Sequence, residues 1–145
     1  MSAKIKRFIV VSLSDSNSWG YNEHTLPLLL RLVDSSMPDA RSFTHLGVVA
    51  YFLTSPQALV AVETLITQAG ALRDSDSRFA TLSIGLAEGE LLGEFDWLGR
   101  LKKNSIVPLG TAYNEAVLSA EEPQKYKETL RVLRERLHGV VRNPA

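Results

Sequence analysis

The side chains best suited to metal binding or nucleophilic chemistry are few and scattered in this chain of 145 residues. The three histidines, His24, His45 and His138, lie far apart, and none has a partner three or four residues away that would place two metal ligands on one helix face. No cysteine is present, which excludes disulfides, thiolate metal sites and a cysteine nucleophile. We therefore predict neither a metal site nor a cofactor.

The acidic residues form no evident catalytic pair. Five of them could in principle share acid–base work: Asp15, Glu88, Glu90, Glu94 and Asp96. Glu88 and Glu90 alternate with apolar positions, as the solvated positions of a strand do. The surrounding "SIGLAEGELLG" lacks the GxxxxGK[ST] order that cradles phosphates, so we interpret it as a strand with bends.

The composition favours one globular domain over residues 1–145. Hydrophobic residues make up 45% of the chain, and 16 basic residues balance 16 acidic ones. Because no net charge attracts polyanions, we expect no nucleic-acid partner. No stretch approaches the roughly 20 apolar residues that span a bilayer, and the apolar run after "MSAKIKR" is interpreted as a strand rather than a secretory signal. We predict a cytoplasmic protein without a membrane partner.

The first half of the chain predicts a strand, a helix, a hairpin and a second helix. Residues 5–13 are rich in β-branched types and predict a buried strand. Thr25 is a candidate cap for a helix whose apolar face is expected to carry Leu26, Leu30 and Val33. Residues 42–53 predict a hairpin with Gly47 in its middle. Ser55 and Pro56 open the next helix, which we expect to end at Gly70.

The second half predicts a strand and two helices. A loop at residues 73–78 precedes strand character over residues 79–95, with expected bends at three glycines: Gly85, Gly89 and Gly93. Thr111 opens a short helix, and Pro123 opens a final helix that ends at Gly139. The apolar stripe of this last helix comprises Tyr126, Leu130, Leu133 and Leu137. The order of elements predicts an α+β fold, a ferredoxin-like sheet with helices packed on one face.

The arrangement of these segments resembles the class III adenylate/guanylate cyclase catalytic domain over roughly residues 5–120. "HLGVVAYF" at 45–52 falls on that family's "GDGVVAVF" hairpin pattern, and a helix, "LSIGLAEGELLGEF" and "PLGTAYNEAV" follow in the family's order. "ATLSIGLAEGE" is also similar to the corresponding strand of GGDEF diguanylate cyclases, whereas "GTAYNEA" favours the nucleotide cyclases. The resemblance implies a cyclase-like fold and an active site formed between two such domains.

The resemblance also implies that most catalytic positions are altered. The family holds two divalent ions with two aspartates; Leu46 stands at one of these positions, and the other falls on Ser14 or Asp15. The two base-reading positions correspond to Ser42 and Val107. Asn114 matches the asparagine that orients the ribose, but Leu118 replaces the arginine that stabilises phosphate charge in the transition state.

Three hypotheses follow from this pattern. The first is a catalytically inactive cyclase-homology domain, not an enzyme, that acts as a regulatory or protein-interaction module in a signalling role. It would form a homodimer or bind a regulatory protein, with Leu46, Phe43 and Tyr51 as interface residues. The second is a nucleotide-binding enzyme with a rebuilt site that uses Asp15, Asn114 and the acids near Glu88. The third is an unrelated ferredoxin-like binding domain.

Overall fold

The chain folds around one antiparallel sheet. The computed structural model describes residues 2–14, 25–44, 47–98, 100–102, 107–108, 116 and 123–142. The sheet has the strand order β2-β3-β1-β4-β5. Its strands are β1 (Ser2–Ser14), β2 (Ala40–Thr44), β3 (Gly47–Leu53), β4 (Ser83–Phe95) and the short β5 (Val107–Pro108). The order of β1 to β4, with a helix after β1 and another after β3, is ferredoxin-like, so the predicted α+β class is confirmed.

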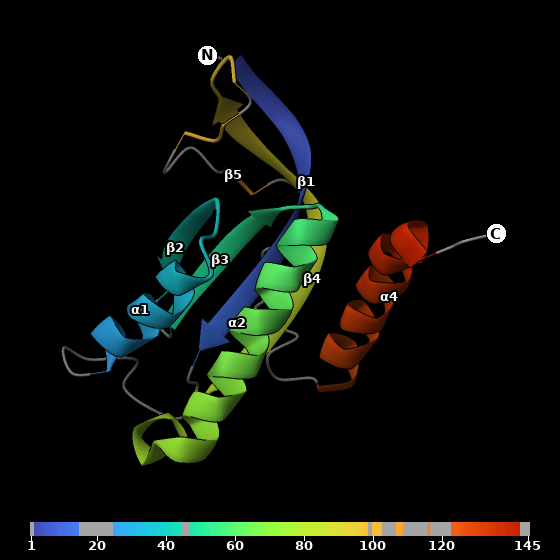
Figure 1. Cartoon of the computed structure of the whole chain (residues 1–145). Helices are drawn as coiled ribbons and strands as arrows, with labels where there is room; N and C mark the ends of the chain where they lie inside the picture. Colours follow the sequence, from blue (N-terminus) through green and yellow to red (C-terminus); the bar gives the residue numbers. More distant parts are fainter. Residues whose placement is uncertain are drawn as a thin grey trace.

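In the described part of the chain three helices accompany the sheet: α1 (Leu26–Ser35), α2 (Pro56–Ser75) and α4 (Pro123–Arg142). Figure 1 shows α1, α2 and α4 on the same side of the sheet, with α2 across its centre. A short 3-10 helix, Ser77–Phe79, follows α2 where the sequence predicts a loop. The predicted short helix at Thr111 falls outside the described residues except for Ala116.

Strand alternation divides the buried side chains into two cores. In β1, Ile9, Val11 and Leu13 face the helices and join the helix-side core, while Phe8 and Val10 face the other way. The far-side core contains these last two residues together with Val49, Tyr51, Ala87, Leu91, Phe95 and Ala116. Because both faces of β1 are buried, its sequence shows an apolar run, as the central strand of a covered sheet does.

The predicted start of α2 is confirmed, but its predicted end is wrong. The Ser55 side chain accepts a hydrogen bond of 2.9 Å from the Ala58 backbone N–H, and Pro56 occupies the first turn. The helix continues past Gly70 to Ser75, because Leu72 packs against the helix-side core and offsets the weak helix propensity of glycine.

The buried face of α1 differs from the prediction by one position. Leu29 and Val33 are fully buried, whereas Leu26 and Leu30 pack against the core from its margin. Pro27 lies in the first turn, but Thr25, the predicted cap, makes no side-chain capping bond. The buried stripe therefore follows the i, i+4 pair Leu29 and Val33.

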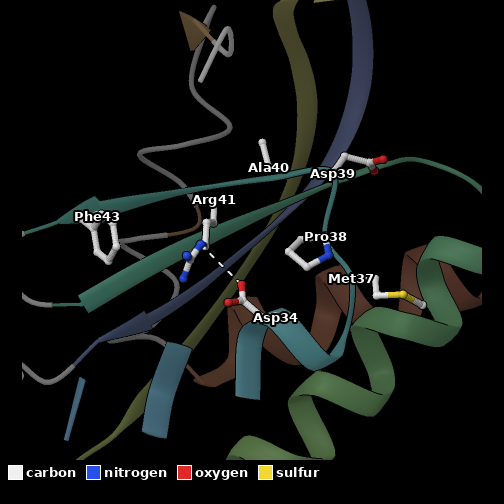
Figure 2. A pocket seen from close by; sticks show the side chains of 7 residues that line it. All are labelled: Asp34, Met37, Pro38, Asp39, Ala40, Arg41 and Phe43. Atoms are coloured by element: carbon white, nitrogen blue, oxygen red, sulfur yellow. Dashed lines mark ion pairs between the residues drawn. The ribbon is translucent and has the colours of Figure 1, made fainter. Parts of the chain in front are cut away.

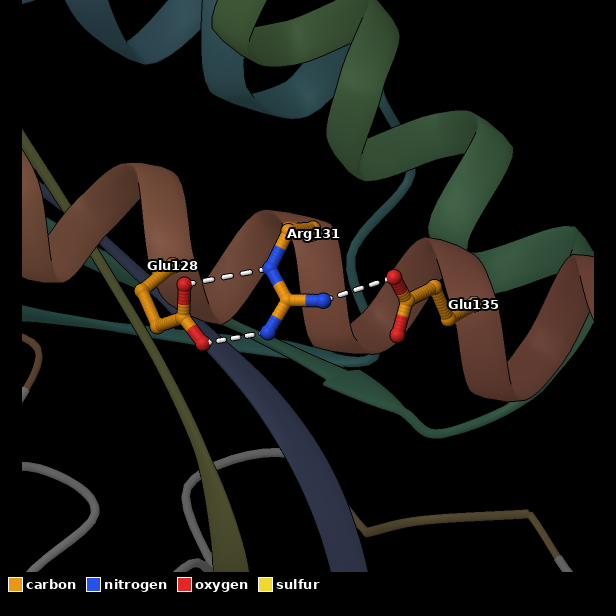
Figure 3. Close-up of polar contacts among 3 residues, drawn as sticks. All are labelled: Glu128, Arg131 and Glu135. Carbon is orange, nitrogen blue, oxygen red and sulfur yellow. Dashed lines mark hydrogen bonds and ion pairs between the residues drawn. The ribbon is translucent and has the colours of Figure 1, made fainter.

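The apolar stripe of α4 is confirmed. Leu130 and Leu133 are buried in the helix-side core, and Tyr126 and Leu137 pack against it. The helix ends at Arg142 and not at Gly139. On its exposed side Arg131 bridges two carboxylates, with contacts of 2.5 Å to Glu128 and 2.6 Å to Glu135 (Figure 3). These ion pairs lie in water, so we assign the attachment of α4 to its apolar stripe.

Candidate functional site

The end of β1 next to the β2–β3 hairpin is the candidate site implied by the sequence. Ser14, the last residue of β1, pairs in register with Gly47 of β3 and with Ser83 of β4. By strand alternation Ser12 and Ser14 project from the far side of the sheet, and they are 1% and 7% exposed. The end of β1 therefore carries two buried hydroxyl groups, and these two residues supply no carboxylate.

Gly47 allows the hairpin to approach β1 closely. A Cβ atom at this position would lie 2.0 Å from the carbonyl oxygen of Leu13 and 2.9 Å from the Cα atom of Ser14. No side chain can occupy such a position without moving the backbone. The predicted role of Gly47 in the hairpin is therefore explained by a close contact with the strand that carries Ser14.

Ser42, the position that the cyclase resemblance assigns to base recognition, is engaged within the chain. Its hydroxyl shares a hydrogen bond of 2.9 Å with the hydroxyl of Tyr51. Both residues lie on the far side of the sheet, since Ser42 pairs with Val49 and Ala40 pairs with Tyr51. Tyr51 is 3% exposed, so its ring belongs to the far-side core of its own chain.

The residues predicted for an interface separate in the structure. Phe43 is 59% exposed, while Tyr51 and the neighbouring Phe52 are buried. Phe52 faces the helix-side core and Tyr51 the far-side core, as adjacent strand residues must. Phe43 is thus available to a partner, and the assignment of Tyr51 to an interface stays a prediction that requires its core to open.

Glu88 is not the solvated strand residue that its sequence pattern indicates. Its side chain is 8% exposed and lies between two arginines. Arg7 of β1 donates a hydrogen bond of 3.1 Å to one carboxylate oxygen, and Arg136 of α4 donates to the other. Burial raises the pKa of Glu88, but the hydrogen bonds from Arg136 and Arg7 outweigh it, so the pKa lies below its ordinary value.

This arrangement makes Glu88 a structural residue. A carboxylate kept ionised by two guanidinium groups is a poor proton donor or acceptor near neutral pH. It joins α4 to the centre of the sheet, and a second ion pair, Glu63 with Arg134, joins α4 to α2. The hypothesis of a rebuilt active site near Glu88 therefore gains no support from these contacts.

Several predicted site residues lie outside the described part of the chain: Asp15, Leu46, Asn114 and Leu118. Val107 lies in β5, where it pairs with Leu92. In the residues that are described, no three histidine, aspartate or glutamate side chains gather into a group that could hold a metal ion. The roles of Asp15 and Asn114 in ligand binding stay predictions.

A pocket of about 480 Å³ lies at the edge of the sheet, and no sequence pattern predicts it. Figure 2 shows its lining, which comes from the end of α1, the connection to β2 and β2 itself: Asp34, Met37, Pro38, Asp39, Ala40, Arg41 and Phe43. Arg41 lies 3.4 Å from the Asp34 carboxylate and 5.7 Å from the centre of the Phe43 ring. The sequence feature that corresponds to this pocket is a pair of apolar residues among charged ones, Met37 and Phe43, both of which are exposed.

Solved structures with a similar fold are nucleotide cyclases. The crystal structure of the guanylyl cyclase Cya2 matches with a TM-score of 0.52 at 16% identity, over 83% of this chain and 72% of that one. A bacterial light-regulated adenylyl cyclase gives a TM-score of 0.48 at 15% identity, over 89% of this chain; the chain spans 46% of its length. The sequence matches no protein-family profile and no curated protein at a significant level.

The comparison with Cya2 establishes the class of fold. Together with the strand order, it shows that the chain has a nucleotide-cyclase-like α+β fold. At 16% identity this similarity carries the fold and not the activity. No helix in the described part of the chain has the length and apolarity needed to cross a membrane.

Proposed function

We propose that this chain is a cyclase-fold domain without cyclase activity that works through association with a second copy or with a regulatory protein. The observation that supports it most directly is Ser14 at the end of β1, in register with Gly47. The cyclase resemblance implies one metal-binding aspartate at the end of β1 and one in the turn before Gly47. With Ser14 at the first position, a serine and Leu46 occupy these two places, and two divalent ions would lack their carboxylate ligands.

The nucleotide base would also find an altered site. The cyclase resemblance implies a base-reading lysine at position 42, whereas the Ser42 side chain is shorter and its hydroxyl is hydrogen-bonded to Tyr51. Leu118 stands where the resemblance implies an arginine that stabilises phosphate charge in the transition state, and the leucine side chain cannot donate a hydrogen bond. Loss of one donor of this kind already lowers kcat by about 10² to 10³, so the combined losses would abolish turnover.

The experiment is an assay for cyclic nucleotides with purified protein, ATP or GTP, and Mg²⁺ or Mn²⁺. We expect no product above a control without protein, while an active guanylyl cyclase measured in parallel gives product. Cyclic product from this chain would overturn the proposal. It would point to the second hypothesis, in which Asp15 and Asn114 serve a rebuilt site.

A pair of variants tests the metal positions themselves. Ser14→Asp combined with Leu46→Asp restores two carboxylates at the ends of β1 and the hairpin, so Mn²⁺ should bind more tightly to the double variant than to the parent chain. Turnover should still be absent because Ser42, Val107 and Leu118 are unchanged. If Asp15 instead serves as the metal ligand, Asp15→Asn will abolish Mn²⁺ binding in the parent chain, and the alignment on Ser14 is wrong.

A further inference from the structure

A projecting arm is formed by the start of β1 and the end of β4 with the turn that follows. Residues 2–6 pair with residues 91–95, and in Figure 1 this part of the sheet extends beyond the start of α2. The arm ends in a turn from Asp96 to Arg100. Asp96 accepts hydrogen bonds of 2.9 Å from the backbone N–H groups of Leu98 and Arg100, and the Arg100 guanidinium donates to it at 2.8 Å.

The two described apolar residues of this turn lie in water. Trp97 is 88% exposed and Leu98 is 55% exposed. A backbone bond of 2.9 Å from Asp96 to Arg100 closes the same turn. Folding gains little from a tryptophan held in this way, whereas binding benefits, because little conformational freedom is lost when a preorganised aromatic side chain enters a partner.

The pocket at the edge of the sheet has the properties of a receptor for such a side chain. Met37, Pro38 and Phe43 supply apolar walls, and the volume of about 480 Å³ accommodates an indole ring. The Asp34 carboxylate, which lies 3.4 Å from Arg41, offers an acceptor for the indole N–H.

The arm and the pocket also differ in charge. The pocket residues include two carboxylates, Asp34 and Asp39, and one guanidinium, Arg41. Among the described residues of the arm three basic side chains outnumber two acidic ones: Lys4, Lys6 and Arg100 against Glu94 and Asp96. The arm is therefore positive where the pocket is negative, which favours their encounter.

We propose that the arm of one copy of this chain docks in the edge pocket of a second copy, with the Trp97 side chain in the pocket lined by Met37, Pro38 and Phe43. The proposal deepens the proposed function, since it names the surfaces of its self-association. Each chain carries both surfaces, so two copies related by a two-fold axis make the contact twice, and each pocket receives one arm. Arg41 then lies beside two aromatic rings, its own Phe43 and the partner's Trp97.

Light scattering and sedimentation of the full chain test the association. We expect a mass of twice 16.0 kDa that falls to one chain on dilution. Trp97→Ala removes the inserted ring, and Phe43→Lys places a cation in the pocket facing the partner's Arg100. Each should weaken association by more than about tenfold. Val60→Lys is the matched control, because Val60 is 58% exposed on α2 and lies outside both surfaces.

Mixing the two defective variants provides the decisive experiment. In a mixed pair, Trp97 of the Phe43→Lys copy can enter the intact pocket of the Trp97→Ala copy, so one of the two contacts is restored. The mixture should therefore associate more tightly than either variant alone. A mixture no better than its components, or a parent chain that stays at the mass of one copy at every concentration, would overturn the docking.

Two further outcomes separate this inference from others. Binding of the parent chain to anionic phospholipid vesicles, lost with Trp97→Ala while the chain remains a single copy, would make the arm a membrane anchor and overturn the docking. Dimerisation unchanged by Trp97→Ala and Phe43→Lys would overturn the docking but leave the proposed function standing. Cyclic-nucleotide synthesis would overturn the proposed function and leave the docking to be judged by the mixing experiment.

Discussion

A Cβ atom on Gly47 would lie 2.0 Å from the carbonyl oxygen of Leu13, so the β2–β3 hairpin and the end of β1 can lie this close together only because residue 47 is a glycine. Van der Waals contact between such atoms requires well over 3 Å. Any side chain at Gly47 must therefore push β3 away from β1 at the point where Ser14 is placed.

We predict that Gly47→Ala lowers the free energy of unfolding by about 3 kcal/mol or more, or prevents folding. The cause is backbone displacement, since the contacted atoms belong to the backbone of β1. Urea denaturation followed by circular dichroism measures it. A variant as stable as the parent chain would show that the two strands separate easily.

The matched control is Gly70→Ala in α2. The nearest heavy atom to a Cβ there is in the flexible Arg73 side chain, 3.9 Å away. Alanine should raise the free energy of unfolding by roughly 0.5–1 kcal/mol because it favours the helical backbone. Opposite signs for the same chemical change would identify the close approach as the cause.

The hydroxyl pair of Ser42 and Tyr51 supports a second prediction. Tyr51→Phe leaves the ring in the far-side core but removes a bond of 2.9 Å, so the free energy of unfolding should fall by about 1 kcal/mol. Ser42→Ala should cost a similar amount, and the double variant should cost less than the sum of the two. Strict additivity of the two losses would mean that the hydroxyls do not interact.

The cap of α2 supports a third prediction. Ser55→Ala removes the acceptor for the Ala58 N–H and should lower the free energy of unfolding by about 1 kcal/mol. Ser55→Asn keeps an acceptor at the cap and should stay near the parent value. If both variants lose the same stability, the capping bond is not the reason for the preference at this position.

Most helices and strands can be predicted from patterns that act within a few residues of the sequence. The β-branched residues at 5–13 predict β1, and the Ser55–Pro56 pair predicts the start of α2, because a cap bond and a first-turn proline act within a few residues. The end of α2 was missed at Gly70, since the packing of Leu72 against the helix-side core outweighs the local preference of glycine. The buried face of α1 differs from the prediction because the burial of Leu29 depends on the sheet against which the helix packs.

The candidate sites were predictable only in part. Gly47 was found because a hairpin glycine is a local signal, but the Ser42–Tyr51 bond depends on the register of two strands. The partners of Glu88 are 81 and 48 residues away in the chain, so its pattern of alternation indicated solvent exposure. The edge pocket is formed by the end of a helix, a connection and a strand, so no single residue spacing in the sequence predicts it.

The carboxylate of Glu88 supports the last prediction. Glu88→Gln keeps the shape of the side chain but removes the charge that Arg7 and Arg136 share, so α4 should be held less firmly on the sheet. The buried side chain is 8% exposed, and hydrogen bonds to such a charged group contribute about 1.5–3 kcal/mol, which sets the expected loss in free energy of unfolding. Arg131→Gln on the exposed face of α4 is the control and should change stability little, because its ion pairs lie in water.

The pH dependence of this loss gives the sharper test. The pKa of Glu88 in the folded chain lies below the ordinary value of 4.5, so its contribution is fully present above that value and disappears as the pH falls through the folded pKa. The difference in free energy of unfolding between the parent chain and Glu88→Gln should therefore be constant near neutral pH and shrink below about pH 4.5. Denaturation at a series of pH values measures it, and a difference that grows on acidification would show that burial, rather than the two arginines, sets the ionisation of Glu88.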